Sequence, residues 1–264
     1  MKRGKVYIVG AGPGDPELLT VKAQRLIGEA DAVVYDRLVA REIIDLIPTG
    51  VMRIDVGKRA GLHPVPQDQI NALLVRLAAS GRRVVRLKGG DPFTFGRGGE
   101  EAESLAEAGL AFEVVPGITS ASGSAAALGI PLTHRGVATS LRYITGHCRS
   151  DAELDFDWQG LADPDTTLVV YMGLANIGQI AGRLVAAGLS QDTPVAAVAN
   201  GTTSRQSHVV ATLGTISREV EAIAEDGPVL FVIGKVVGLA GILGQDFSGA
   251  TRQTAVTPHV VPAL

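Results

Sequence analysis

The sequence predicts an α/β protein of two lobes, with a mostly parallel sheet in the N-terminal lobe and a mixed sheet in the C-terminal lobe. Short apolar, β-branched runs alternate with amphipathic stretches in the first half, a pattern typical of βα units. In the second half, two predicted strands are separated by only a short turn, which requires antiparallel pairing. The chain has 264 residues, of which 46% are hydrophobic and 19% charged, enough for two compact cores.

The first half contains five predicted strands. After Pro66, apolar residues recur at helical spacing, and Gly81 should end this helix. Pro116 and Gly117 then interrupt the pattern, and the small residues of 119–129 predict a tightly packed helix. The predicted strands are Lys5 to Val9, Ala32 to Tyr35, Met52 to Val56, Val84 to Leu87 and Ala111 to Val115.

The second half resembles a further α/β lobe. The segment from Asn200 to Thr203 is too short for a crossover helix, so the strands on either side should pair antiparallel. The predicted strands are Leu141 to Thr145, Thr167 to Met172, Pro194 to Ala199, Ser207 to Thr212 and Val229 to Ile233.

These patterns predict three parts of the chain. An N-terminal lobe should span 1–117, and a C-terminal lobe should span 118–246. The remaining 247–264 lack periodicity, and we expect a flexible tail.

Charge and composition restrict the class of partner. The formal net charge of −3 gives no overall attraction to nucleic acid or to an anionic membrane, so an acidic ligand would need a local cluster of Arg or Lys. No apolar run approaches the roughly 18 residues of a membrane span, and no signal-peptide pattern is seen. The lone Cys148 cannot form an intramolecular disulfide. We expect a cytoplasmic protein that binds neither nucleic acid nor membrane.

The first glycine-rich loop, Val9 to Asp15, follows a predicted strand and precedes a helix. A dinucleotide-binding loop needs its third glycine where Asp15 stands, and Pro13 stiffens the turn. An NAD-dependent oxidoreductase is therefore a weak alternative, beside a purely structural turn. No loop has the Gly-Lys-Ser/Thr ending of a Walker A motif.

The second glycine-rich loop follows the fourth predicted strand. Gly89 and Gly90 allow backbone atoms to face a ligand, and Asp91 supplies an acceptor. Arg97 lies in a bend before a helix that should begin near Glu100. Ligands of open α/β sheets bind outside the carboxyl ends of the strands, which makes this loop a candidate site. A plain surface loop would explain the glycines but not the clustered charges.

A set of motifs resembles the uroporphyrinogen-III C-methyltransferases, members of the S-adenosylmethionine-dependent tetrapyrrole methylase family. The motifs occur in order along nearly the whole chain, and the Tyr-Asp-Arg and Gly-Arg-Gly-Gly-Glu-Glu segments favour uroporphyrinogen. They are Val9-Gly-Ala-Gly-Pro-Gly-Asp, Val34-Tyr-Asp-Arg-Leu, Val56-Gly-Lys-Arg, Arg86-Leu-Lys-Gly-Gly-Asp-Pro-Phe, Phe95-Gly-Arg-Gly-Gly-Glu-Glu, Val115-Pro-Gly-Ile-Thr-Ser and Tyr171-Met-Gly.

The resemblance implies a two-lobed tetrapyrrole methylase fold, a homodimer, and S-adenosylmethionine as methyl donor with S-adenosylhomocysteine as product. It implies methylation of uroporphyrinogen III at C2 and C7, giving precorrin-2 via precorrin-1, for siroheme and/or cobalamin synthesis. Two alternatives stay open: a methyltransferase of the same fold acting on a later precorrin, and a noncatalytic tetrapyrrole-binding protein.

The resemblance also implies the site residues. The catalytic set is Asp36 as proton acceptor, Lys58 as proton donor, and Arg97. The cofactor set is Pro13, Gly89, Gly90, Asp91, Thr94, Thr119, Ser120, Met172 and Gly201. The substrate set is Arg37, Arg97, Glu100, Arg135 and Met172.

Simpler readings of these residues also stay open. Asp36 could cap a helix or pair with Arg37, and each arginine could be an ordinary surface charge. His147 and Cys148 are neighbours on a strand and would point to opposite faces, so no metal site is expected.

Overall fold

The computed structural model describes residues 4–57, 65–147, 154–223 and 227–243. The chain divides into two compact units, Met1–Ser120 and Ala121–Leu264, which we call unit 1 and unit 2. Each unit contains one five-stranded sheet, so the predicted α/β class with a parallel and a mixed sheet is confirmed. Cys148 and the predicted tail, 247–264, lie outside the described residues.

The sheet of unit 1 is wholly parallel, with the strand order β3-β2-β4-β1-β5. Every predicted strand is present, and each end lies within one residue of its predicted place. The central strands are almost completely buried because helices cover both faces of the sheet. The strands are β1 (Lys5–Gly10), β2 (Ala32–Tyr35), β3 (Met52–Asp55), β4 (Arg83–Lys88) and β5 (Ala111–Val115).

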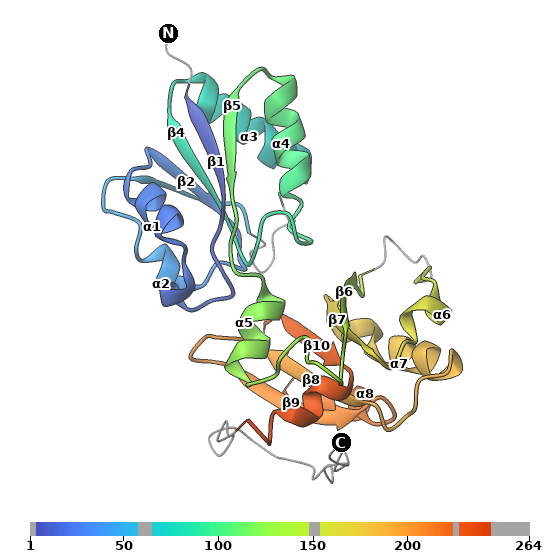
Figure 1. Ribbon diagram of the computed structural model, residues 1–264. Coiled ribbons are helices and arrows are strands. Elements are labelled where there is room, and N and C mark those ends of the chain that lie inside the picture. Colours follow the sequence, from blue (N-terminus) through green and yellow to red (C-terminus); the bar gives the residue numbers. More distant parts are fainter. Residues whose placement is uncertain (1–3, 58–64, 148–153, 224–226, 244–264) are drawn as a thin grey trace. The chain divides into compact units, whose positions relative to one another are not determined.

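Two pairs of helices cover the two faces of this sheet (Figure 1). On one face, Leu26 and Ile43 pack with Val85; on the other, Leu74 and Leu105 pack with Val84. The helix predicted after Pro66 is present. The first face carries α1 (Val21–Gly28) and α2 (Arg41–Ile44), and the second carries α3 (Gln67–Ala79) and α4 (Gly98–Glu107).

The connections that leave β1 and β4 define where a ligand can bind in unit 1. These strands are neighbours in the sheet, but β1 leads to α1 on one face and β4 leads to α4 on the other. Such a divergence opens a crevice at the carboxyl ends of the two strands. Both glycine-rich loops lie at this place.

The sheet of unit 2 is mixed, with the strand order β6-β7-β10-β8-β9. Only β6 and β7 pair in parallel; β10 pairs antiparallel with β7 and β8, and β8 pairs antiparallel with β9. The antiparallel hairpin predicted at Asn200 is therefore confirmed. The strands are β6 (Ser140–Thr145), β7 (Thr166–Tyr171), β8 (Pro194–Ala199), β9 (Ser207–Thr212) and β10 (Val229–Ile233).

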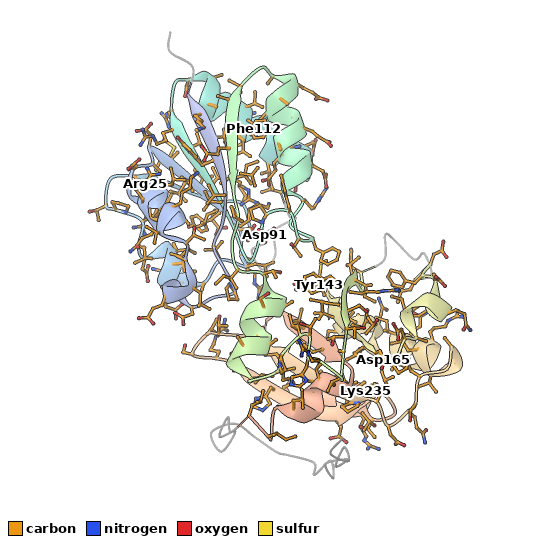
Figure 2. The ribbon with its side chains drawn as sticks, viewed as in Figure 1. Arg25, Asp91, Phe112, Tyr143, Asp165 and Lys235 are labelled. Carbon is orange, nitrogen blue, oxygen red and sulfur yellow. The ribbon has the colours of Figure 1, made fainter. Side chains whose placement is uncertain are left out.

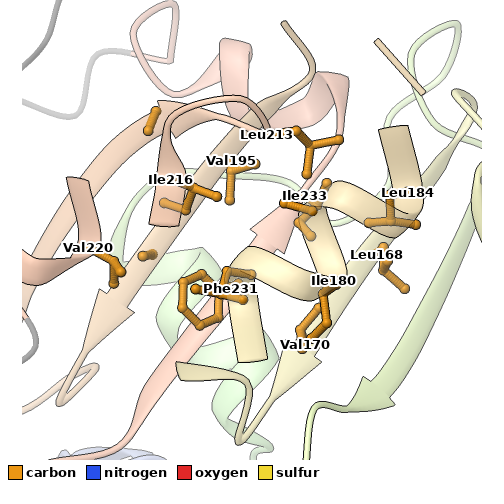
Figure 3. Close-up of a cluster of buried hydrophobic side chains, with 14 of the residues drawn as sticks. Leu168, Val170, Ile180, Leu184, Val195, Leu213, Ile216, Val220, Phe231 and Ile233 are labelled. Carbon is orange, nitrogen blue, oxygen red and sulfur yellow. The ribbon is translucent and has the colours of Figure 1, made fainter. Parts of the chain in front are cut away.

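Two hydrophobic clusters cover the two faces of the sheet of unit 2. Phe231, Ile180 and Leu184 belong to the larger one (Figure 3). The other includes Ala121 and Ala125 of the small-residue helix. The helices are α5 (Ser120–Ala127), α6 (Trp158–Leu161), α7 (Ile177–Ala186) and α8 (Ile216–Glu219), with short 3-10 turns η2 (Leu174–Asn176), η3 (Val220–Ala222) and η4 (Lys235–Leu239); a further 3-10 turn, η1 (Pro16–Leu18), belongs to unit 1. None of the helices in the described ranges has the length and apolarity needed to cross a membrane.

Candidate active site

The loops after β1 and β4 are joined by their backbones. The amide of Gly12 donates to the carbonyl of Gly90 at 3.1 Å, and the amide of Gly90 donates to the carbonyl of Gly12 at 2.7 Å. Both residues have left-handed backbone angles, with φ of +74° and +68°, which only glycine adopts at little cost. The pair holds the two loops together at the carboxyl edge of the sheet.

Close backbone approaches explain several glycines of this region. A Cβ atom on Gly117 would lie 2.3 Å from the carbonyl oxygen of Gly90 and 2.8 Å from the Cα of Gly10. A Cβ atom on Gly89 would lie 2.7 Å from the Cβ of Leu38. These glycines therefore let the loops after β1, β2, β4 and β5 pack against one another. This packing between loops accounts for the glycines without a ligand.

Asp91 ties the loop after β4 to the loop after β5. Its Oδ1 accepts from the amide of Phe93 at 2.9 Å and from the hydroxyl of Thr94 at 3.2 Å, and its Oδ2 accepts from the amide of Gly117 at 3.1 Å. The side chain lies at the carboxyl edge of the sheet of unit 1 (Figure 2). Oδ1 already accepts two hydrogen bonds, whereas Oδ2 accepts one and keeps capacity to accept another from a ligand.

The other cofactor candidates of unit 1 lie on the same loops. Pro13 is partly buried beside Gly12, Thr119 lies between β5 and α5, and Ser120 is the first residue of α5. The hydroxyl of Ser120 lies 3.5 Å from the place that a Cβ atom on Gly90 would take. The structure thus brings together, within unit 1, the candidates that the resemblance assigns there.

The loop after β1 lacks the context of a dinucleotide-binding motif. Asp15, at the position of the third glycine, accepts a hydrogen bond from the amide of Glu17 and caps the 3-10 turn η1. Helix α1 begins only at Val21, so the loop does not open directly into an α-helix whose N-terminus could bind a pyrophosphate. The loop therefore lacks the geometry that an NAD-dependent oxidoreductase would need.

Four charged side chains form a network at the carboxyl end of β4, which we call the β4 charge network: Asp36, Arg86, Lys88 and Glu101. Glu101 Oε1 lies 3.0 Å from Arg86 Nε and 2.8 Å from Lys88 Nζ. Asp36 Oδ2 lies 3.1 Å from Arg86 Nη2. Burial and the nearby Arg86 guanidinium lower the pKa of Lys88, while Glu101 opposes this change.

Sequence reasoning gave Arg86, Lys88 and Glu101 no role. Arg86 and Lys88 alternate with Val85 and Leu87, so they occupy one face of a strand that is otherwise apolar. Charged residues are almost never fully buried unless they are paired. Two charges on one face of a central strand were the signal that could have revealed the network.

The environment of Asp36 corrects two simpler readings. Its Oδ1 accepts from the amide of Leu38 at 3.1 Å, and helix α2 begins only at Arg41, so Asp36 caps no helix. Its ionic partner is Arg86 and not Arg37, whose side chain is exposed. Asp36 is therefore a partly buried carboxylate at the end of β2. Lys58, its proposed partner in proton transfer, lies outside the described residues.

Arg97 and Glu100 form a bidentate pair at the start of α4. Arg97 Nε and Nη2 each lie 2.7 Å from an oxygen of Glu100, and these hydrogen bonds raise the pKa of Arg97. Arg97 has a left-handed φ of +58°, and about half of each side chain is exposed. The substrate candidates Arg97 and Glu100 thus form one ion pair, and a substrate carboxylate that bound Arg97 would share its guanidinium with Glu100.

The candidates of unit 2 lie on loops and turns. Met172 follows β7 with a φ of +52° and is 51% exposed. Gly201 lies in the turn after β8, and a Cβ atom there would be 2.1 Å from the hydroxyl of Ser124 in α5. Since β7 and β8 run in the same direction, Met172 and Gly201 lie at the same edge of the sheet. Arg135 is exposed in the turn closed by His134 and Ala138.

The described residues contain no group of three or more His, Cys, Asp or Glu side chains that could hold a metal ion. The groups gathered at the carboxyl edge of unit 1 are backbone amides and carbonyls, carboxylates and arginines. Such groups can bind a polar ligand, pair with an acid and accept a proton.

The chain is similar in sequence to tetrapyrrole-modifying enzymes. The chain is 54% identical over 237 residues to the uroporphyrinogen-III C-methyltransferase of Paracoccus denitrificans, which covers 90% of this chain and 83% of that relative. It is 55% identical over 236 residues to the siroheme synthase of Azotobacter vinelandii, covering 89% of this chain but only 51% of that protein. The chain therefore spans about half the length of that relative.

A solved structure and a family description agree with these relatives. The crystal structure of uroporphyrin-III C-methyl transferase from Thermus thermophilus complexed with S-adenyl homocysteine matches with a TM-score of 0.75 and 41% identity, over 89% of this chain and 93% of that chain. Residues 5–217 match the family described as tetrapyrrole (corrin/porphyrin) methylases. The resemblance drawn from the motifs is confirmed, and the chain belongs to the tetrapyrrole methylase family.

Proposed function

We propose that this protein transfers methyl groups from S-adenosylmethionine to C2 and C7 of uroporphyrinogen III, giving precorrin-2 via precorrin-1. The observation that carries the proposal is the 54% identity to a uroporphyrinogen-III C-methyltransferase across most of both chains. The siroheme synthase of Azotobacter vinelandii is about twice as long as the part that this chain matches. Similarity to it therefore supports only the methylation step for this protein, not the synthesis of siroheme as a whole. Its product would serve siroheme or cobalamin synthesis.

The cofactor site of unit 1 is proposed to consist of Pro13, Gly89, Gly90, Asp91, Thr94, Thr119 and Ser120. The loops that carry these residues interlock through glycines, so their backbones lie close together at the strand ends with little side-chain bulk between them. Carbonyl groups and the Asp91 carboxylate suit the ammonium and ribose hydroxyls of S-adenosylmethionine. The same proposal assigns Met172 and Gly201 of unit 2 to cofactor binding.

When bound, S-adenosylmethionine supplies a methyl group on a sulfonium sulfur. A carbon–carbon bond forms at the pyrrole ring as the carbon–sulfur bond breaks, and the macrocycle then loses a proton. We assign proton acceptance to Asp36, because its carboxylate is partly exposed and both of its oxygens are held in place. Lys58 is proposed as proton donor.

Substrate recognition is assigned to Arg37, Arg97, Glu100, Arg135 and Met172. Uroporphyrinogen III carries several carboxylates, and a protein with a net charge of −3 must meet them with local cations. The exposed side chains of Arg37, Arg97 and Arg135 support this role. We further propose a homodimer that acts in the cytoplasm.

The test is an anaerobic incubation of the protein with uroporphyrinogen III and excess S-adenosylmethionine, followed by mass and absorbance analysis. The expected product carries two added methyl groups and passes through a monomethylated intermediate. Turnover of a later precorrin without turnover of uroporphyrinogen III would favour the alternative methyltransferase. Binding of the tetrapyrrole without consumption of the methyl donor would indicate a noncatalytic binding protein.

A further inference from the structure

One member of the β4 charge network is partly exposed. The side chains of Arg86, Lys88 and Glu101 are at most 5% exposed, whereas that of Asp36 is 26% exposed. The buried members lie beneath the carboxyl edge of the sheet, and Asp36 is the point at which the network meets the solvent.

Arg86 uses each of its three nitrogen atoms within unit 1. Its Nε donates to Glu101 Oε1 at 3.0 Å, and its Nη1 donates to the carbonyl of Leu87 at 3.1 Å. Its Nη2 donates to Asp36 Oδ2 at 3.1 Å. A planar guanidinium fixed at two nitrogens leaves the third with a defined direction, so it can hold a carboxylate in one orientation.

The contacts of Asp36 complete this geometry. Because Arg86 holds Oδ2 and the amide of Leu38 holds Oδ1, the carboxylate cannot rotate without losing a hydrogen bond. Lys88 and Gln67 anchor the other end of the network through Glu101 Oε1, at 2.8 and 3.2 Å. The network therefore runs from the buried Glu101 to the partly exposed Asp36 carboxylate at the edge of the sheet.

We propose that Arg86 is a positioning residue that acts through Asp36: it holds the Asp36 carboxylate in the orientation that accepts the proton released after methyl transfer. This inference rests on the proposed function, and it assigns a role to a buried residue whose three nitrogens all donate to groups of unit 1. Arg86 therefore affects the rate of the reaction through Asp36, and affects ligand binding little.

The experiment is a double-mutant cycle with Arg86→Met and Asp36→Asn in the full chain. Arg86→Met should lower kcat about ten- to a hundredfold, the range of one charge-assisted hydrogen bond. The KM for uroporphyrinogen III and the Kd for S-adenosylhomocysteine should change by less than about threefold. In the Asp36→Asn background, Arg86→Met should lower kcat by less than about twofold further, because its target is already lost.

Two further variants control the cycle. Arg86→Lys keeps the charge, but the lysine side chain cannot reach Glu101 and Asp36 together. Its kcat should therefore lie between those of wild type and Arg86→Met. Arg86→Lys replaces Arg86→Met in the cycle if Arg86→Met does not fold. Arg83 is an exposed arginine on the same strand and pairs with Glu29. Arg83→Met should leave kcat unchanged.

The outcomes separate the two proposals. Equal losses of kcat from Arg86→Met in both backgrounds would overturn the positioning role, as would an unchanged kcat in folded Arg86→Met or Arg86→Lys. An effect on KM or on cofactor Kd alone would also overturn it. If the wild-type protein methylates no uroporphyrinogen III, the proposed function fails instead. The unfolding free energies of wild type, Arg86→Met, Asp36→Asn and the double variant give a readout that does not depend on turnover. If the losses of unfolding free energy in the two single variants added up to the loss in the double variant, Arg86 and Asp36 would not be coupled and the inference would be refuted.

Discussion

Lys88 Nζ lies 2.8 Å from Glu101 Oε1, and both side chains are almost completely buried. The same oxygen accepts from Arg86 Nε and from the side-chain amide of Gln67. Glu101 Oε2, in contrast, finds no hydrogen-bond partner among the residues that the structure describes. One carboxylate thus compensates two buried cations, and this makes Glu101 the most sensitive member of the network.

The first prediction concerns the charge of Glu101. Glu101→Gln keeps the shape of the side chain but leaves Lys88 and Arg86 with only Asp36 as a counterion. The free energy of unfolding should fall by about 3 to 5 kcal/mol, the usual loss when one partner of a buried pair is removed. Denaturant unfolding measures this. Glu103→Gln, an exposed position on the same helix, should change it by less than about 0.5 kcal/mol; equal effects of the two substitutions would contradict the prediction.

The second prediction concerns acid. Hydrogen bonds from Lys22 and Lys5 lower the pKa of Glu113 from its usual 4.5 to about 2. Since the folded-state pKa is depressed, Glu113 stabilises the fold above about pH 4.5, and this contribution is lost as the pH falls toward 2. Glu113→Gln should therefore destabilise the protein at pH 7 and make little difference at pH 2.

Thermal unfolding across this range checks the prediction. Because Glu113 lies at the surface, added salt should weaken its effect at pH 7. Glu103→Gln serves again as the control for loss of a surface carboxylate. If the difference between Glu113→Gln and wild type were the same at pH 2 and pH 7, the assigned cause would be wrong.

The strands could be predicted from the sequence because each is a short β-branched run between turn-forming residues. Ala32–Tyr35 and Pro194–Ala199 have the predicted bounds. The β4 charge network could not be predicted in this way, because Asp36 and Arg86 meet only through the pairing of β2 with β4. The register that places Val34 beside Arg86 depends on the order of strands in the sheet, which local patterns do not contain.

The glycines show a second limit of the sequence. A run such as Gly89-Gly90 predicts close approach, but it does not say whether the approaching group belongs to a ligand or to the protein. In the structure, Leu38 approaches Gly89, and Gly117 approaches Gly90. The motifs nevertheless located the candidate site, because these glycines lie at the ends of adjacent parallel strands.

The third prediction tests this packing. Gly117→Ala would place a Cβ atom 2.3 Å from the carbonyl oxygen of Gly90, so the loops after β4 and β5 must separate. We expect lower stability and a loss of S-adenosylhomocysteine affinity of at least about tenfold, measured by calorimetry. Gly28→Ala is the control, since a Cβ atom there would meet nothing within 4 Å. Normal affinity in folded Gly117→Ala would show that the cofactor does not use this packing.

The last prediction separates substrate binding from cofactor binding at Arg97. Arg97→Ala should raise the KM for uroporphyrinogen III by about ten- to a hundredfold, because a charge-assisted contact with a substrate carboxylate is lost. The Kd for S-adenosylhomocysteine should change little, since the Arg97 guanidinium pairs with Glu100 and not with the glycines that hold the loops after β1, β4 and β5 together. Arg97→Lys should recover only part of the affinity, because lysine keeps the charge but not the bidentate geometry.

Arg25→Ala is a closely matched control for Arg97→Ala. Both arginines are 56% exposed, and each pairs with a glutamate three or four residues along the chain. If loss of a surface ion pair were the cause, the two substitutions would have the same small effect on stability and turnover. A role in recognition requires that only Arg97→Ala raise the KM. Arg135→Ala should behave like Arg97→Ala, and unchanged kinetics in either would make that arginine an ordinary surface charge.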